Sequence, residues 1–195
     1  MSKLIITSSR EPSRRTRSFI KDLVKAIPNS LRFNRGKATL DDLASIARRN
    51  EAHAVMIILE KKGNPSAIVH YEPAEEGLVK KALMKITGVK LLREIRGGQT
   101  PYNIKTIVLN PQKINEEMQL KVANFLAALL KTAPKPPDLL TPAIEVSVGS
   151  GEEPTVRFIC LQTQRICGPQ FKVLKVINYP RGGKRDQGGA EAEEA

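Results

Sequence analysis

The N-terminal part of the chain alternates between short apolar runs and segments in which apolar residues recur at helical spacing. Residues 4–7 are apolar and β-branched and predict a buried strand, and residues 14–27 predict a helix that starts beside Pro12. The strands and helices predicted next are 31–33, 39–50, 54–59 and 67–71. The resulting order of strand, helix, strand, helix, strand, strand is typical of an α/β sheet with helices on its faces.

The remainder of the chain repeats part of this order. Residues 77–96 fit a helix or strands, and we favour strands in the second half of that segment. A strand at 105–109 and a helix at 114–131 repeat the strand-loop-helix order of residues 4–27, with a proline-rich linker at 133–137. Further strands are predicted at 143–148, 155–161 and 165–178. The recurrence indicates two related halves.

The helix predicted at 14–27 has two opposite faces. Its apolar side chains recur at helical spacing and predict a core-facing side: Phe19, Ile20, Leu23, Val24 and Ile27. Four basic residues are spaced by three, four and four positions: Arg14, Arg17, Lys21 and Lys25. At about 100° per residue these four form one stripe, roughly opposite the apolar side. One face of the helix is therefore predicted to lie in the core and the other to carry a row of cations.

The charge of the chain indicates what kind of partner it binds. The 195 residues hold 32 Lys and Arg against 20 Asp and Glu, a net charge of +12. Residues 8–37 alone hold nine basic and two acidic residues, and six of the nine are Arg, whose guanidinium makes forked hydrogen bonds to phosphate. This concentration favours a polyanionic partner over a merely solvated face. Aromatic residues are only 4% of the chain, which disfavours stacking of several bases on an aromatic sheet.

Catalytic and metal-binding chemistry is not indicated. The sequence holds no phosphate-binding glycine loop, nucleophile elbow or zinc-protease motif. Asp41 and Asp42 fit a helix start, and His53 and His70 fit structural roles in or beside strands. We therefore predict that the protein is not an enzyme and has no catalytic residues, metal or cofactor. No apolar run reaches the length of about 18 residues that a membrane span needs, and no signal peptide is evident, so we expect a cytoplasmic protein without a membrane partner.

The two cysteines, Cys160 and Cys167, leave two possibilities open. They are too few for a disulfide framework or a four-ligand zinc site. A two-residue turn at Thr163-Gln164 would place them opposite each other at bridging distance, but Thr-Gln is a poor turn sequence. A disulfide and two buried thiols both remain consistent with the sequence.

Three stretches of the chain are distinctive beyond their composition. They are TSSREPSRRTRSFIKDLVKAIPNSLRFNRGK from Thr7, KKGNPSAI from Lys61 and CGPQFKV from Cys167. Together they resemble the Brix-domain proteins of ribosome biogenesis in their short archaeal form, with Gln170 where relatives often carry Arg. The resemblance implies a Brix domain over residues 1–180. The remaining tail, 181–195, is rich in Gly, Ala and charged residues, and this composition predicts disorder.

The same resemblance implies a fold and a function. The domain would consist of two similar halves, approximately 1–98 and 99–180, each similar to the anticodon-binding domain of class II aminoacyl-tRNA synthetases. Mixed sheets would be flanked by helices, with N-terminal elements exchanged between the halves. The function would be to bind ribosomal RNA precursors during subunit assembly and rRNA processing, together with other assembly factors or ribosomal proteins.

The candidate RNA-binding residues are the nine cations of residues 8–37 and one aromatic residue. They are Arg10, Arg14, Arg15, Arg17, Lys21, Lys25, Arg32, Arg35, Lys37 and Phe171. The resemblance implies that Arg35 and Lys37 lie across a groove from the arginines at 10–17. Two other functions remain open. A general RNA or tRNA chaperone would not prefer pre-ribosomal particles, and a protein-docking scaffold would keep its partner after nuclease treatment.

Overall fold

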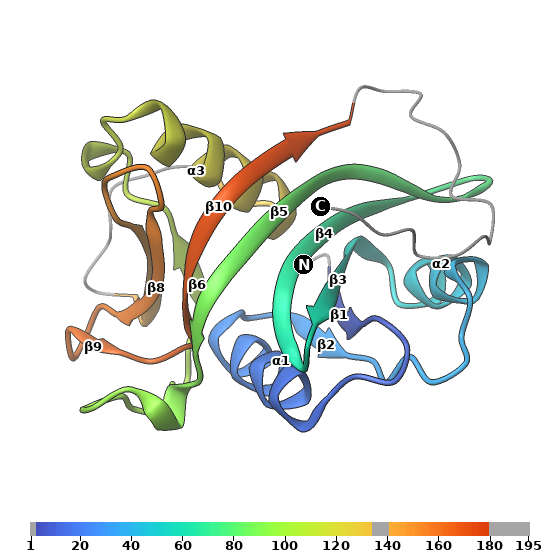
Figure 1. Cartoon of the computed structure of the whole chain (residues 1–195), viewed down its shortest axis with the longest axis horizontal. Helices are drawn as coiled ribbons and strands as arrows, with labels where there is room; N and C mark the ends of the chain where they lie inside the picture. Colours follow the sequence, from blue (N-terminus) through green and yellow to red (C-terminus); the bar gives the residue numbers. More distant parts are fainter. Residues whose placement is uncertain (1–2, 134–140, 180–195) are drawn as a thin grey trace.

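The computed structural model describes residues 3–133 and 141–179, in which helices pack on one curled sheet (Figure 1). The strands of the first part are β1 (Lys3–Ser8), β2 (Ser30–Arg32), β3 (Ala52–Lys61), β4 (Asn64–Ala74) and β5 (Gly77–Lys90). The later strands are β6 (Thr106–Val108), β7 (Ala143–Val148), β8 (Thr155–Cys160), β9 (Arg165–Ile166) and β10 (Gln170–Asn178). The helices are α1 (Arg14–Ala26), α2 (Leu40–Arg49) and α3 (Glu117–Leu130), with 3-10 turns η1 (Leu92–Glu94) and η2 (Pro111–Lys113).

The strand order of the sheet is mirrored about its middle. It runs β2-β1-β3-β4-β5-β10-β8-β7-β6, and β9 pairs with β8. On one side β1 and β3 are parallel, while the pairs β3–β4 and β4–β5 are antiparallel. On the other side β6 and β7 are parallel, while β7–β8 and β8–β10 are antiparallel. The antiparallel pair β5–β10 joins the two sides, with Val173 opposite Ile86.

This arrangement confirms the predicted mixed α/β fold, in which a mixed sheet is flanked by helices. The strand-loop-helix order predicted at 4–27 and 105–131 is present as β1–α1 and β6–α3. The division into halves at about residue 98 stays a prediction, which the mirrored strand order supports. The likeness of each half to an anticodon-binding domain also stays a prediction.

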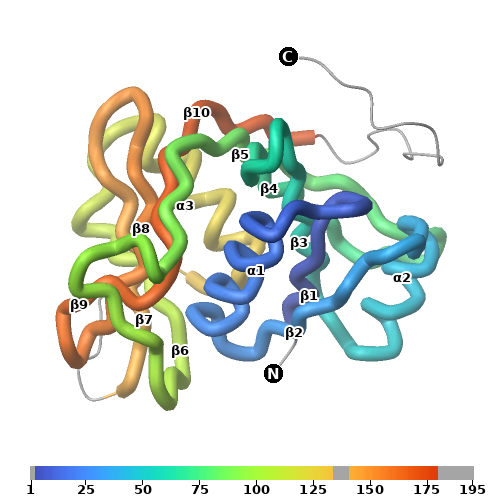
Figure 2. The backbone as a smooth tube through the Cα atoms, turned by 60° about the horizontal axis from the view of Figure 1, so that its bottom comes forward, coloured from blue at the N-terminus to red at the C-terminus, as the bar shows by residue number. Residues whose placement is uncertain are grey.

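Helices α1 and α3 share one core and reach across the middle of the sheet. The Phe19 ring of α1 meets the Phe171 ring of β10 edge-on, with the ring centroids 5.9 Å apart. In the other direction, the Leu129 carbonyl oxygen of α3 lies 3.0 Å from Nε2 of His53 in β3. Figure 2 shows α1 between the strands of the two sides. Each helix therefore contacts strands of the opposite side, as expected if elements are exchanged between halves.

Helix α2 packs against the other face of the sheet. Its buried Leu43 and Ala47 lie in a cluster with Ile5, Val55 and Val69. The start of α2 is fixed by Thr39 and Asp42, as the sequence predicts. The Thr39 backbone N–H donates to the Asp42 carboxylate at 2.8 Å, and the Asp42 N–H donates to the Thr39 hydroxyl at 3.1 Å. This reciprocal cap sets where the preceding loop ends.

Several element boundaries differ from the sequence prediction, and two of the differences have a clear structural cause. Residues 77–90 form one continuous strand, β5, because it pairs with β4 on one side and with β10 on the other. Such pairing overrides helical spacing, and buried Ala82 and Met84 follow the period of a strand. The helix predicted at 114–131 begins only at Glu117, since η2 precedes it. There the Gln119 side chain accepts the backbone N–H of Glu116 at 3.1 Å.

The two cysteines form a disulfide, with their Cα atoms 5.8 Å apart. Of the two possibilities left open by the sequence, the disulfide is therefore present, but the two-residue turn considered for it is not. Cys160 stands opposite Arg165, not Cys167, because the turn spans residues 161–164 with Gln164 at a positive φ. The bridge therefore joins the end of β8 to the segment between β9 and β10.

Two predictions fall outside the described residues. The first is the disordered tail predicted at 181–195, and the second is the linker predicted at 133–137, of which only residue 133 is described. In residues 3–133 and 141–179, no helix is long and apolar enough to cross a membrane.

Candidate nucleic-acid interface

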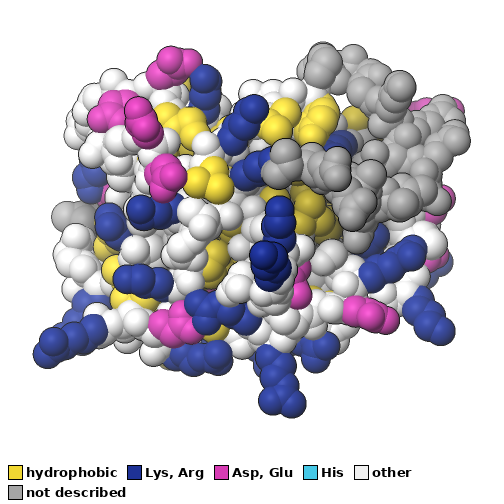
Figure 3. Space-filling model, in the orientation of Figure 1, with side chains coloured by type: hydrophobic (Ala, Val, Ile, Leu, Met, Phe, Trp, Pro, Cys, Tyr) yellow, Lys and Arg dark blue, Asp and Glu magenta, His cyan; other side chains and the backbone are white. Residues whose placement is uncertain are grey.

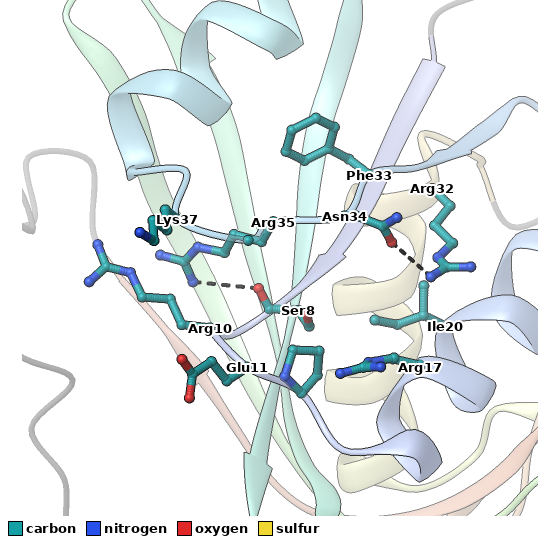
Figure 4. A pocket seen from close by; sticks show the side chains of 12 residues that line it. Ser8, Arg10, Glu11, Arg17, Ile20, Arg32, Phe33, Asn34, Arg35 and Lys37 are labelled. Atoms are coloured by element: carbon teal, nitrogen blue, oxygen red, sulfur yellow. Dashed lines mark hydrogen bonds between the residues drawn. The ribbon is translucent and has the colours of Figure 1, made fainter.

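A cavity of about 690 Å³ opens where two loops meet the first turns of α1. One wall is the loop that follows β1, and the other is the segment that runs from β2 toward α2 (Figure 4). The cavity is lined by Ser8, Arg10, Glu11, Pro12, Arg17, Ile20, Arg32, Phe33, Asn34, Arg35, Gly36 and Lys37. Five of these residues are basic and one is acidic. We call this site the basic cavity.

The first wall is held by a carboxylate at the end of β3. Glu60 accepts the Ser13 backbone N–H at 2.9 Å and the Thr16 hydroxyl at 2.5 Å. Ser13 is the N-cap of α1, and its hydroxyl also donates to the Gly63 carbonyl at 2.9 Å. Burial raises the pKa of Glu60, but the hydrogen bonds from Thr16 and Ser13 outweigh this and hold the pKa below its usual value. The ionised Glu60 therefore fixes the start of α1, and with it the position of Arg17.

The second wall is ordered by its own polar side chains. Asn34 accepts a hydrogen bond from the Arg32 guanidinium at 2.7 Å, which holds the flat guanidinium beside the loop. Arg35 donates to the Ala38 carbonyl at 3.3 Å within the same loop. It also reaches the Ser8 carbonyl on the first wall at 3.5 Å. Arg35 thus links the two walls.

The basic stripe of α1 continues from the cavity along the helix. Arg14, Arg17, Lys21 and Lys25 are all exposed, while Phe19 and Leu23 on the opposite side are buried. The two-faced helix predicted from the sequence is therefore confirmed. Figure 3 shows Lys and Arg side chains outnumbering Asp and Glu along the lower edge of the molecule, where Figure 1 places α1. Together, the stripe and the cavity make one extended positive surface.

Arg15 occupies a different position from its neighbours in sequence. Its guanidinium donates to both carboxylate oxygens of Glu94, at 2.5 and 2.8 Å, and to the Val89 carbonyl at 2.7 Å. The hydrogen bond from Arg15 is the main reason that the pKa of Glu94 lies below its usual value. Next to this pair, Asp22 accepts the Leu92 backbone N–H at 2.8 Å. Arg15 therefore fastens α1 to the segment after β5, and we leave it out of the proposed interface.

Phe171 is a core residue. Its ring is 1% exposed and packs against Phe19, so the prediction that Phe171 contacts RNA is wrong. The sequence of the strand predicted at 165–178 does not show which of its faces is covered. Only the packing of α1 onto β10 shows which face is covered.

Some lining residues had no signal in the sequence. Ser8, Asn34 and Phe33 lie in the cavity because β1 and β2 are parallel neighbours that end at the same edge of the sheet. Glu60 lies 47 residues from Ser13 in sequence, so no local pattern could have connected them. In the described parts of the chain, no group of three or more His, Cys, Asp or Glu residues is placed to hold a metal ion.

The chain is similar to proteins of ribosome biogenesis, although no family model matches it. A probable Brix domain-containing ribosomal biogenesis protein of Aeropyrum pernix is 29% identical over 183 residues, which cover 92% of this chain and 99% of that protein. The U3 small nucleolar ribonucleoprotein protein imp4 of Schizosaccharomyces pombe is 40% identical over 67 residues, which cover 34% of this chain and 23% of that protein.

A solved structure extends the similarity to the fold. The crystal structure of a probable ribosomal biogenesis protein from Aeropyrum pernix matches with a TM-score of 0.78 and 27% identity, over 89% of this chain and 96% of that one. The resemblance to the archaeal Brix-domain proteins of ribosome biogenesis is therefore confirmed along nearly the whole chain.

Proposed function

We propose that this relative of the archaeal Brix-domain proteins is a ribosome assembly factor that binds ribosomal RNA precursors through the basic cavity and the stripe of α1. The observation that carries the proposal is the convergence of five cations on one cavity that contains a single carboxylate, Glu11. Like charges held this close repel one another, so the arrangement favours a partner that brings negative charge to it.

Phosphate groups of RNA fit this surface. Guanidinium groups make forked, charge-assisted hydrogen bonds to phosphate oxygens, and Arg10, Arg17 and Arg32 supply three of them from three separate elements. Exposed Lys21 and Lys25 extend the positive surface by about two helical turns from Arg17. An RNA backbone would follow the stripe and enter the cavity, with most of its affinity independent of sequence.

The relatives supply the ribosomal context of the proposal. The Aeropyrum pernix protein is named for ribosomal biogenesis, and the Schizosaccharomyces pombe protein for a small nucleolar ribonucleoprotein. We propose that this chain acts in a comparable complex with other assembly factors or ribosomal proteins, in the cytoplasm, without a catalytic role or a cofactor.

A titration of RNA binding against salt tests the interface. Arg10→Ala with Lys37→Ala removes two exposed cavity cations, and Arg165→Ala with Lys105→Ala removes the same charges from exposed positions outside the cavity lining. If about four phosphates are contacted on a single strand, the slope of log K against log salt is near −3 for the wild type. We expect the magnitude of the slope to fall by about 1.4 in the cavity variant, which loses two phosphate contacts, and to stay unchanged in the control. Equal losses in the two variants would contradict the proposed interface.

The two other functions give different results. A general RNA or tRNA chaperone would bind bulk RNA from a lysate as well as pre-ribosomal particles. A protein-docking scaffold would remain with such particles after their RNA is digested. We expect the wild-type protein to sediment with pre-ribosomal particles, and nuclease treatment or the Arg10→Ala, Lys37→Ala change to release it.

A further inference from the structure

The basic cavity has two ends of different chemistry. In Figure 4, the side chains of Arg10, Arg35 and Lys37 gather at one end, with Glu11 below them. Arg17, Ile20, Arg32 and Asn34 form the other end, and Ser8 lies between the two groups. One end is therefore dominated by positive charge. The other combines two guanidinium groups with the apolar side chain of Ile20.

The second end has the features that a nucleic-acid base requires. Ile20 lines this end beside Arg32 and Arg17 and is only 3% exposed, so it backs the site with an apolar side chain while the exposed guanidinium groups face the opening. The guanidinium of Arg32 is held by Asn34 at 2.7 Å, so its planar face is oriented before any ligand arrives. Unstacked RNA bases bind by stacking on guanidinium planes and by hydrogen bonds to their edges. Asn34 and Ser8, which also line the cavity, bring polar groups to this end.

The first end has the features that a phosphate requires. Arg35 is positioned by the carbonyls of Ala38 and Ser8, at 3.3 and 3.5 Å. Arg10 and Lys37 are exposed beside it, and three cations with one carboxylate leave this end net positive. A bound phosphate would therefore gain charge-assisted hydrogen bonds where the walls are already joined.

The size of the cavity favours an unstacked nucleotide over an RNA duplex. Its volume of about 690 Å³ is typical of sites that enclose a small molecule, which are about 300–1,000 Å³. The bases of an A-form duplex are stacked inside the helix, so the duplex offers only its phosphates and grooves and cannot place a base between the walls of the cavity. A nucleotide that has left the stack can place its base and its phosphate in the cavity together.

We infer that the basic cavity binds one unpaired nucleotide of an RNA bulge or loop, with the base at the Arg32–Ile20 end and the phosphate at the Arg10–Lys37 end. This inference rests on the proposed function and specifies which RNA element the same site selects.

Three RNA hairpins of equal length test the inference. One is fully paired, one carries a single bulged adenosine, and one carries an abasic bulge with the same phosphates. We expect the wild-type protein to bind the adenosine bulge about tenfold more tightly than the other two, which is the range of a single stacked base. Arg32→Lys keeps the charge but removes the planar guanidinium, so it should abolish this preference. Arg10→Lys, at the phosphate end, should keep it.

The outcomes separate this inference from the proposed function. Equal, salt-sensitive binding of all three hairpins would overturn the inference and leave the proposed function standing. Failure to bind any hairpin would overturn both. A polyglutamate peptide that competes as strongly as the bulged hairpin would assign the cavity to an acidic protein partner, which would also overturn the inference.

Discussion

Gly168 lies in a tight space between Phe158 of β8 and Ala26 of α1. A Cβ added at this position would lie 2.7 Å from Cβ and 2.8 Å from Cγ of Phe158, and 3.0 Å from Cβ of Ala26. Carbon atoms in packed interiors are about 3.5–4.0 Å apart, so these neighbours would have to move by up to about 1 Å. Overpacking of this kind costs about 1–3 kcal/mol. At about 2–4 °C per kcal/mol for a chain of this length, a cost of about 2 kcal/mol lowers the Tm by about 4–8 °C.

Thermal melts of Gly168→Ala and of a control, Gly149→Ala, measure this cost. The nearest atoms to a Cβ on Gly149 are the Thr155 backbone N and O at 3.4 Å, so we expect that variant to melt within about 1 °C of the wild type. Adding Ala26→Gly to Gly168→Ala removes one of the three close contacts. The double variant should therefore be less destabilised than the sum of the two single variants. If Gly168→Ala melts like the control, Phe158 and α1 do not pack against the segment before β10 as the structure shows.

Other expected outcomes concern the core, pH, the disulfide and the Arg15 pair. Leu23→Ala removes a side chain that is 1% exposed and should cost about 2–5 kcal/mol in denaturant unfolding, whereas Lys21→Ala on the exposed face should stay within about 0.5 kcal/mol. Burial lowers the pKa of His70 to about 4, so the unfolded chain binds the proton more readily. Stability should then fall by about 2 kcal/mol from pH 7 to pH 5, and this loss should be absent in His70→Gln. Thiol titration of the unreduced, denatured protein should find no free thiol, and two free thiols would contradict the disulfide. Because the bridge closes a short loop, with a sequence separation of seven, reducing it should lower the free energy of unfolding by about 2 kcal/mol. Arg15→Gln removes the ion pair with Glu94, so it should lower the Tm without changing the salt slope of RNA binding. An unchanged Tm together with a reduced slope would show that Arg15 contacts RNA.

Local patterns in the sequence predicted the features that depend on local geometry. The two faces of α1 follow from the spacing of Leu23 and Arg17 along one helix, and the cap of α2 follows from Thr39 and Asp42 three residues apart. The concentration of charge at residues 8–37 falls on the basic cavity, because β1 and β2 bring their following loops to one edge of the sheet.

Features that depend on distant partners could not be predicted in this way. Arg14 and Arg15 are identical and adjacent, and the position of Glu94, 79 residues along the chain from Arg15, is what gives Arg15 its ion pair. Phe171 is buried because α1 packs onto β10, which no spacing in the sequence encodes. Residues 77–90 form a strand because both of their neighbours, β4 and β10, are strands. In each case the deciding contact is tertiary.

Crosslinking of the protein to RNA in cells, followed by sequencing of the bound fragments, tests the proposed function most directly. We expect fragments of ribosomal RNA precursors to dominate, and crosslinked peptides to lie within residues 8–37, which hold both loops of the basic cavity. Replacing Arg10 and Lys37 by Ala should remove most of these crosslinks, while replacing Arg165 and Lys105 should not. Two results would contradict the proposal that this cavity binds precursor ribosomal RNA. One is that the protein recovers bulk RNA in proportion to its abundance, and the other is that the Arg10→Ala, Lys37→Ala protein keeps its crosslinks.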